Sequence, residues 1–293
     1  MPRGIPRGMA AGASDCERVA DVIADLDWSS IGASLDAQGF AKLPAILSPG
    51  DCESLAALYT NDAHFRSRID MARFRFGVGE YKYFAAPLPA IVQTLREDLY
   101  AHLAPIANRW SSSRRGGPTC PPRGRHTGRP LQRDEVYPPT LDRFLRTCHS
   151  AGQTRPTPLL LSYAAGGYNC LHQDIYGELA FPLQVVFVLS RLGVDYTGGE
   201  LLLVEQRPRA QSRGHAVAVD QGAAVVFATR ERPVEGTRLR SRTKTQASFA
   251  EARHSAEGAT AARGTYRVVM RHGVSALTSG TRMSLGIIFH DGR

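Results

Sequence analysis

The chain has 293 residues, of which 43% are hydrophobic, so it is long enough to bury a substantial core. Its apolar runs, such as residues 185–189, are far too short to cross a bilayer, and residues 1–12 lack the apolar stretch of a secretory signal. The five cysteines show no paired spacing, which favours free thiols over a disulfide framework. These features exclude membrane-spanning and disulfide-rich secreted classes, and we expect a cytoplasmic protein.

The net charge of +9 is concentrated in two segments. Residues 111–133 contain six Arg and no acidic residue, and residues 238–263 contain five Arg and one Lys against two Glu. The rest of the chain is therefore close to neutral, so the total charge alone does not assign a nucleic-acid partner. Both segments are polar and poor in large apolar residues, so residues 111–133 and 239–262 are predicted to be disordered insertions.

The N-terminal half is predicted to be mostly helical over residues 14–157, after a disordered extension over residues 1–13. Apolar residues at helical spacing predict a first helix over residues 14–28, capped by Ser14. The pattern then favours helices over residues 31–38, 49–59 and 89–110, with strands over residues 41–43 and 81–84.

From residue 158 onward the chain becomes a series of short β-runs separated by Gly-containing turns. Seven strands are expected, over residues 159–163, 183–190, 200–205, 217–219, 223–227, 265–271 and 283–289. This number of strands at this spacing favours a sandwich or a jelly roll.

The most informative motif is the His-Gln-Asp triplet at residues 172–174. On an extended strand, His172 and Asp174 would point to the same face, because side chains alternate along a strand. One imidazole and one carboxylate supply two of the three ligands in the 2-His-1-carboxylate set that suits non-haem Fe(II). The triplet alone is weak evidence, because it occurs by chance in many chains. However, His272 follows 100 residues later, and Arg282 comes ten residues beyond it.

That order, a His-X-Asp triplet, a distal His and then an Arg, resembles the Fe(II)/2-oxoglutarate dioxygenase superfamily. Within it, a closer resemblance is to a bacterial family of nucleic-acid oxygenases, predicted to act oxidatively on damaged DNA. The matching strings cover most of residues 36–291 and lie at residues 76–89, 103–110, 155–163, 168–185, 197–213 and 264–291. The resemblance implies a double-stranded β-helix, which is a jelly roll.

The resemblance also implies roles for individual residues. His172, Asp174 and His272 would bind Fe(II), and Arg282 would hold the far carboxylate of 2-oxoglutarate with its planar fork. Tyr163, nine residues before His172, matches a Tyr that bonds the cosubstrate in alkylation-damage demethylases of the superfamily.

Other positions leave alternatives open. Leu161 stands where those demethylases carry an Asn, so that correspondence is incomplete. Tyr81, Tyr83 and Phe84 are candidates either for a wall of the active site or for core packing. His290 competes as the third metal ligand, but no Arg follows it at the needed distance.

Four residues are weaker candidates for contact with the substrate. Asn169 and Gln173 lie beside and within the triplet, and Arg207 and Arg209 form a small basic loop. A turn-forming role for Asn169 and a solvated loop for Arg207 and Arg209 are equally good interpretations.

We therefore expect a mainly β jelly roll with an α-helical N-terminal support, forming one oxygenase domain over residues 14–293 with its catalytic core over residues 158–293. The expected function is Fe(II)- and 2-oxoglutarate-dependent oxidation of a modified base in DNA or RNA, with O₂ as cosubstrate and ascorbate as a candidate reductant. Two alternatives stay open: hydroxylation of an amino acid, protein side chain or small metabolite, and a non-catalytic metal-binding or interaction protein. No membrane partner is expected.

Overall fold

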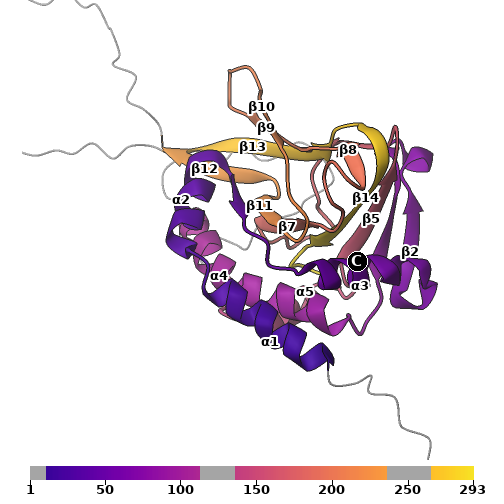
Figure 1. Ribbon diagram of the computed structural model, residues 1–293. Coiled ribbons are helices and arrows are strands. Elements are labelled where there is room, and N and C mark those ends of the chain that lie inside the picture. Colours follow the sequence, from indigo (N-terminus) through magenta and orange to yellow (C-terminus); the bar gives the residue numbers. More distant parts are fainter. Residues whose placement is uncertain (1–10, 113–135, 236–264) are drawn as a thin grey trace, which may run out of the picture.

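The computed structural model describes residues 11–112, 136–235 and 265–293 (Figure 1). The predicted insertions over residues 111–133 and 239–262, and the predicted N-terminal extension, lie outside these ranges except for a few residues at their ends. No helix within the described ranges is long and apolar enough to cross a membrane.

The first helix, α1 (Ala11–Ala24), ends before the predicted residue 28, and the second helix, α2 (Trp28–Gln38), begins before the predicted residue 31. Ser14 lies inside α1, so its prediction as the N-cap was wrong. Asp27 caps α2 instead, because its side chain accepts a hydrogen bond from the Ser30 backbone N–H at 3.0 Å. That cap separates the two helices.

Most other elements of the N-terminal half fall where the sequence indicates. Ser48 and Asp51 form a capping box that starts the third helix. The elements are β1 (Phe40–Leu43), α3 (Pro49–Ala57), η1 (Leu58–Thr60), η2 (Asp62–His64), β2 (Phe65–Asp70), η3 (Ala72–Phe74), β3 (Gly77–Val78), β4 (Glu80–Phe84), α4 (Ala90–Ser112) and α5 (Leu141–Ser150). Strands β2 and β3 and helix α5 were not predicted.

The second half is built from strands. They are β5 (Leu159–Ala164), β6 (Tyr168–His172), β7 (Leu183–Val188), β8 (Tyr196–Gly198), β9 (Leu201–Gln206), β10 (Arg213–Val217), β11 (Ala224–Ala228), β12 (Glu231–Glu235), β13 (Thr265–Val274) and β14 (Leu277–Ile287). The strand predicted over residues 217–219 is instead β10, which ends at Val217, because residues 213–217 are the ones that pair with β9.

The strands form two antiparallel sheets. The eight-stranded sheet has the order β1-β11-β7-β14-β5-β4-β2, with β8 paired to β14; the six-stranded sheet has the order β10-β9-β13-β6-β3, with β12 paired to β13. From β5 to β14 the chain passes repeatedly from one sheet to the other, so that β5, β7, β11 and β14 face β6, β9, β10 and β13. This is a jelly roll, and the predicted fold class is confirmed.

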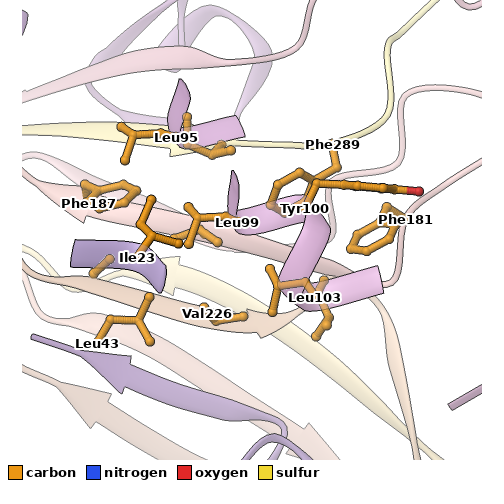
Figure 2. Packing of buried hydrophobic residues seen from close by; sticks show 14 of the residues in the cluster. Ile23, Leu43, Leu95, Leu99, Tyr100, Leu103, Phe181, Phe187, Val226 and Phe289 are labelled. Carbon is orange, nitrogen blue, oxygen red and sulfur yellow. The ribbon is translucent and has the colours of Figure 1, made fainter. Parts of the chain in front are cut away.

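Helices α1 and α4 cover the eight-stranded sheet (Figure 1), as the predicted helical support requires. Their apolar residues pack on that sheet in a large buried cluster, which includes Ile23 and Leu99 from the helices and Phe187 and Val226 from the sheet (Figure 2). A second buried cluster lies between the two sheets, where Tyr163 and Phe227 are among its members. The outer cluster stabilises the scaffold, and the inner one surrounds the candidate site.

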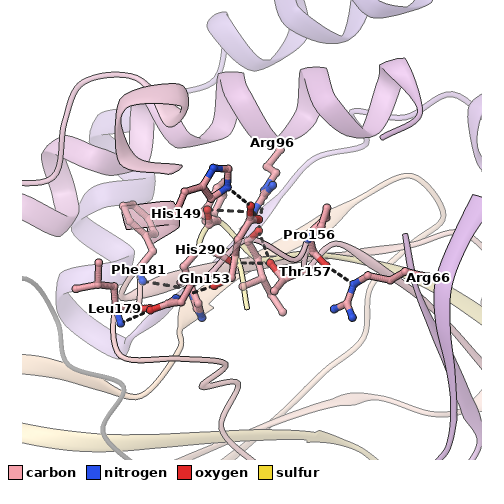
Figure 3. Close-up of polar contacts among 12 residues, drawn as sticks. Arg66, Arg96, His149, Gln153, Pro156, Thr157, Leu179, Phe181 and His290 are labelled. Carbon is pink, nitrogen blue, oxygen red and sulfur yellow. Dashed lines mark hydrogen bonds and ion pairs between the residues drawn. The ribbon is translucent and has the colours of Figure 1, made fainter. Parts of the chain in front are cut away.

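The segment that follows β14 is tied to the helices by a polar cluster (Figure 3), here called the C-terminal network, which comprises Arg96, Gln153, Thr157, His290 and Asp291. Arg96 is fully buried, and it donates to the Ile288 and Phe289 carbonyls and to Asp291 Oδ1 at 2.7 Å. Gln153 donates to the Asp291 carbonyl at 2.6 Å. These bonds fix the end of β14 against α4.

Candidate active site

The candidate metal ligands lie on, and just after, strands of the six-stranded sheet. His172 is the last residue of β6, and His272 is its register partner in β13. Asp174 follows two residues later, with Oδ1 3.4 Å from His172 Nε2 and Oδ2 3.1 Å from His272 Nε2. Among the described residues, these three form a cluster whose potential ligand atoms all lie within 4.8 Å of one another.

Neighbouring groups orient the first two ligands. His172 Nδ1 lies 2.7 Å from the Cys170 carbonyl, to which it can donate, and Nε2 is then free to coordinate a metal. The Tyr176 hydroxyl donates to Asp174 Oδ1 at 2.7 Å. Both contacts are of the kind that hold a ligand in place outside the metal's own coordination sphere.

His272 is the most deeply buried of the three ligands. The Phe227 ring packs against its imidazole at a centroid distance of 4.8 Å. The Gln184 amide nitrogen lies 3.4 Å from Nδ1 and 3.3 Å from Nε2 of His272, and Gln184 Oε1 has no hydrogen-bond partner among the described residues. These neighbours come from the eight-stranded sheet, so the site lies between the two sheets.

The three ligands shift one another's pKa values. Burial opposes ionisation of Asp174, but the two imidazoles outweigh burial and hold the pKa of its carboxyl well below the usual range. Burial lowers the pKa of His272, and the neighbouring His172 lowers it further. Burial also raises the pKa of Tyr176 well above its usual value, and the Asp174 charge adds to the effect, so its hydroxyl stays protonated as a donor. An ionised carboxylate beside a neutral imidazole is the state that binds a metal.

The donor set fits a divalent iron. Two ligand atoms on one face of an octahedron lie about 3 Å apart when metal–ligand bonds are about 2.1 Å long. The distances from Asp174 to His172 and His272, 3.4 and 3.1 Å, are close to that value. Two imidazoles and one carboxylate on one face, with the other positions open, is the arrangement found in non-haem Fe(II) oxygenases.

Arg282 lies in β14, on the facing sheet, and is 1% exposed. Its Nη1 donates to Ser284 Oγ at 3.2 Å, while its Nε has no hydrogen-bond partner in the described part of the chain. No carboxylate of the described residues forms an ion pair with it, in contrast to the equally buried Arg96 and Arg232. A buried cation without an internal counter-ion is costly, so this guanidinium is suited to receive an anionic group from outside.

Tyr163 is the register partner of Arg282 in β5 and is fully buried. Burial raises the pKa of its hydroxyl to about 12, although the nearby Arg282 opposes the shift. Asn169 donates to that hydroxyl at 3.3 Å. Tyr163 therefore presents a neutral hydroxyl next to the arginine, where both can bind one carboxylate.

A cavity of about 350 Å³ joins these groups. Its walls include all three candidate ligands and Arg282, Tyr163 and Asn169. The volume lies at the small end of the range for ligand sites in proteins. One cavity thus contains a metal-binding cluster and an unpaired cation.

The weaker candidates for substrate contact divide into two groups. Asn169 and Gln173 line the cavity, but the Gln173 amide donates to the backbone carbonyls of Arg230 and Met270, at 3.2 and 2.7 Å. Arg207 and Arg209 lie in the β9–β10 turn and are not among the residues that line the cavity. Arg207 is paired with Glu205 at 2.5 Å, which favours the reading as a surface loop.

The alternatives left open around the site are now resolved in geometric terms. His290 is outside the ligand cluster, because its Nδ1 accepts a hydrogen bond from the Phe181 backbone N–H at 3.2 Å. Tyr81 lines the cavity, whereas Tyr83 and Phe84 do not and instead lie in buried clusters.

Sequence reasoning missed several groups that surround the ligands, above all Gln184 and Phe227. Gln184 lies in β7, whose sequence is LQVVFV. A single polar residue in an otherwise apolar strand was the sequence signal that could have pointed to Gln184. Gln184 is buried, and a buried polar side chain in such a strand needs a partner, which His272 provides here. Phe227 carried no signal, because a Phe in a buried strand is ordinary.

Comparison with known proteins identifies the family. The model of a family described as "Oxygenase, catalysing oxidative methylation of damaged DNA" matches residues 79–257 and 253–292. Two uncharacterised proteins of Mycobacterium tuberculosis, from strains CDC 1551 and H37Rv, are each 42% identical over 208 residues, which is 71% of this chain and 71% of theirs.

Solved structures with similar architecture include a prolyl-4-hydroxylase of Pseudomonas putida, with a TM-score of 0.45, 14% identity and coverage of 91% of this chain and 99% of that one. An oxidoreductase of the 2OG-Fe(II) oxygenase family from Burkholderia pseudomallei has a TM-score of 0.45 and 13% identity, with coverage of 92% and 93%. The family match extends over the jelly roll and the whole ligand cluster. The chain therefore belongs to this oxygenase family, and the His172, Asp174 and His272 cluster is its candidate metal site.

Proposed function

We propose that this enzyme oxidises a modified base in nucleic acid, and that it does so in the cavity between the two sheets. The observation that carries the proposal is that the ligand cluster and the unpaired Arg282 share one cavity of limited volume. The description of the matched family supports DNA as the substrate class. Because an oxygenase adds oxygen and transfers no carbon, we propose that it removes a methyl group.

In this proposal each polar residue of the site has one task. His172, Asp174 and His272 hold Fe(II) on one face, and Tyr176 keeps the Asp174 carboxylate in position through its hydrogen bond. Arg282 and Tyr163 bind the far carboxylate of 2-oxoglutarate, which supplies the counter-ion that the described residues do not provide. The buried clusters around the cavity exclude water from it.

When bound by these residues, iron with 2-oxoglutarate and O₂ would supply the chemistry that inserts one oxygen atom into a substrate C–H bond and the other into succinate, with release of CO₂. On an N-methyl group the product is an N-hydroxymethyl group. Its C–N bond then breaks, formaldehyde leaves, and the base nitrogen regains a proton. The net result is demethylation.

The size of the cavity restricts how a base can reach the iron. About 350 Å³ holds a small cosubstrate and one planar base, but it does not admit a base pair. The target base therefore has to leave the helical stack or come from a single strand. Small amino acids and peptides also fit such a volume, so the substrate class needs a direct test.

The test is a screen for succinate release with iron, 2-oxoglutarate and O₂. Oligonucleotides that carry N-methylated bases are compared with the same oligonucleotides without methyl groups, and with free amino acids and peptides. We expect methyl-dependent succinate release together with stoichiometric formaldehyde. Release driven by an amino acid or peptide alone would refute the nucleic-acid substrate, and Asp174→Ala serves as the inactive control.

A further inference from the structure

An exposed aromatic and basic segment lies beside the mouth of the cavity. Residues 73–76 read Arg-Phe-Arg-Phe, and Phe74 and Phe76 are 49% and 47% exposed. Their rings stack on each other, with centroids 5.7 Å apart and an angle of 20° between the planes. Arg75 and Phe76 also line the cavity, so the segment, here called the 73–76 platform, connects the site to the surface.

Exposed large apolar residues are concentrated around this platform. Of the eight such residues in the described part of the chain, five lie on it or on the strands next to it: Phe74, Phe76, Val78, Tyr168 and Leu171. A cluster of this kind at a cavity mouth is typical of an interaction surface, because scattered single residues are the rule elsewhere on soluble proteins.

The platform is held rigidly against the strand that carries a metal ligand. The Cys170 backbone N–H donates to the Phe76 carbonyl at 2.8 Å, two residues before His172. A Cβ on Gly77 would lie 2.2 Å from the Tyr168 carbonyl, so only glycine allows β3 to approach β6 this closely. The backbone of the platform therefore keeps a fixed position relative to the ligand cluster.

The charges of the platform are available to a ligand. Arg73 and Arg75 are exposed and have no carboxylate partner among the residues that the structure describes, and the Arg73 guanidinium lies over the Phe74 ring at 5.9 Å. The nearby Asp70 carboxylate accepts the Ala72 backbone N–H at 3.0 Å. Arg75 also has a positive φ of 61°, which is the left-handed conformation of the residue that caps η3.

We infer that the 73–76 platform binds the single-stranded nucleotides next to the base in the cavity, with Phe74 and Phe76 stacking on bases and Arg73 and Arg75 contacting phosphates. This inference rests on the proposed function, because it assigns the surface that holds a nucleic-acid substrate. Flat aromatic faces alternating with unpaired arginines are the chemistry that recognises single strands without reading their sequence. A purely apolar partner would leave both guanidinium groups without a counter-ion.

The first experiment measures binding of a fluorescein-labelled, unmodified single-stranded DNA oligonucleotide to the full chain by fluorescence anisotropy. Phe74→Ala should weaken binding about tenfold, because one stacked base is lost. Phe74→Trp should retain the affinity and Phe74→Leu should not, since leucine keeps the apolar volume without a flat ring. Val194→Ala, at another exposed apolar residue outside the cavity, is the matched control and should change nothing.

The second measurement separates charge from stacking. Arg75→Asn removes the charge and suits the positive φ. It should lower the slope of log affinity against log salt by about 0.7 to 1, the value for one phosphate contact. Arg143→Gln on α5 is a control for loss of one exposed charge. Photo-crosslinking to an oligonucleotide with 5-iodouracil should attach to Phe74 or Phe76, and peptide mapping locates the adduct.

Several outcomes overturn the inference. They are the absence of single-strand binding by the wild-type chain, unchanged affinity in Phe74→Ala, and crosslinks confined to other regions. Affinity retained in Phe74→Leu would show an apolar docking surface for a protein or peptide instead. Methyl-dependent oxidation with an unchanged KM in Phe74→Ala would support the proposed function and refute the role of the platform. Binding that depends on the platform, without oxidation of any base, would support the role of the platform and refute the proposed function.

Discussion

Arg96 and Arg282 are both fully buried, but Arg96 has a carboxylate partner inside the protein and Arg282 has none among the described residues. Arg96 belongs to the C-terminal network, where its donors reach Asp291 and two backbone carbonyls. Arg282 belongs to the cavity, where its Nη1 donates to Ser284 and no carboxylate of the described chain forms an ion pair with it. Similar side chains at similar depth are therefore satisfied in one region and left available in the other.

The difference between the two regions predicts which substitutions lower the stability of the protein and which weaken binding in the cavity. In the C-terminal network the protein supplies its own partners, so removing one of them leaves a buried charge uncompensated and lowers the free energy of unfolding. In the cavity, the proposed partners are a metal and a cosubstrate, so removing a side chain should affect binding more than stability. Each prediction below changes one group in one region.

The largest contrast is expected between two carboxylates, Asp174 and Asp291. Asp174→Ala should abolish metal binding and lower the free energy of unfolding less than the Asp291 variant does, because the Asp174 side chain is more exposed. Asp291→Ala should instead lower the free energy of unfolding by about 3–5 kcal/mol, because Arg96 stays buried without its counter-ion. Anaerobic Fe(II) titration and urea unfolding of the metal-free proteins measure the two effects. Iron binding by the Asp174→Ala variant, or an unchanged free energy of unfolding in the Asp291→Ala variant, would contradict this contrast between the cavity and the C-terminal network.

The next effect is the response of the C-terminal network to acid. Burial and the nearby Arg96 charge lower the pKa of His290 to about 4, against the opposing charges of Asp174 and Asp291. Its pKa in the unfolded chain is about 6.5, so between these two values the unfolded chain binds a proton that the folded chain does not. The His290 contribution is therefore complete above pH 6.5 and falls by about 3 kcal/mol as the pH drops to about 4.

His290→Asn tests this response, because asparagine cannot titrate and keeps an acceptor for the Phe181 N–H. Urea unfolding of the metal-free proteins from pH 7 to pH 4 should show a smaller loss of stability in the variant. The comparison of the two curves cancels the other groups that titrate in this range, including Asp174 and His272. Parallel curves would show that His290 does not contribute.

The smallest of the three effects concerns the cavity arginine. Arg282→Met should weaken 2-oxoglutarate binding about tenfold or more, because a charge-assisted contact is lost. The free energy of unfolding should stay constant or rise, since the substitution removes an unpaired buried charge. Arg96→Met is the matched control and should be strongly destabilised without a specific loss of cosubstrate affinity. Calorimetric titration of the iron-loaded or cobalt-loaded protein gives the affinity, and an unchanged value would exclude the proposed contact.

Short, regular patterns in the sequence predicted most of the strands, and the family resemblance selected a jelly roll over a sandwich. Strand alternation paired His172 with Asp174, and the resemblance added His272 as the third candidate ligand. Strand β2 and helix α5 were also readable, since β2 alternates between half-buried and exposed residues and Leu141, Phe144 and Cys148 follow helical spacing.

Other parts could not be predicted from local patterns. Strand β3 has only two residues, and its position depends on pairing with β6, more than 90 residues away. The contact of Tyr176 with Asp174 arises after β6 ends, where no strand or helix periodicity fixes the side chains. Likewise, the lack of a carboxylate partner for Arg282 among the described residues is a property of the folded protein, because it depends on every acidic residue in that part of the chain that could have reached it.

The pairing of β13 with β6 also has a consequence for protein synthesis. The ribosome releases the chain from its N-terminus, so β6 emerges long before β13 and β14. Until those strands dock, His172 lacks its register partner His272 and the cavity lacks Arg282. An incomplete nascent chain therefore cannot assemble the proposed iron centre before the surrounding walls are in place.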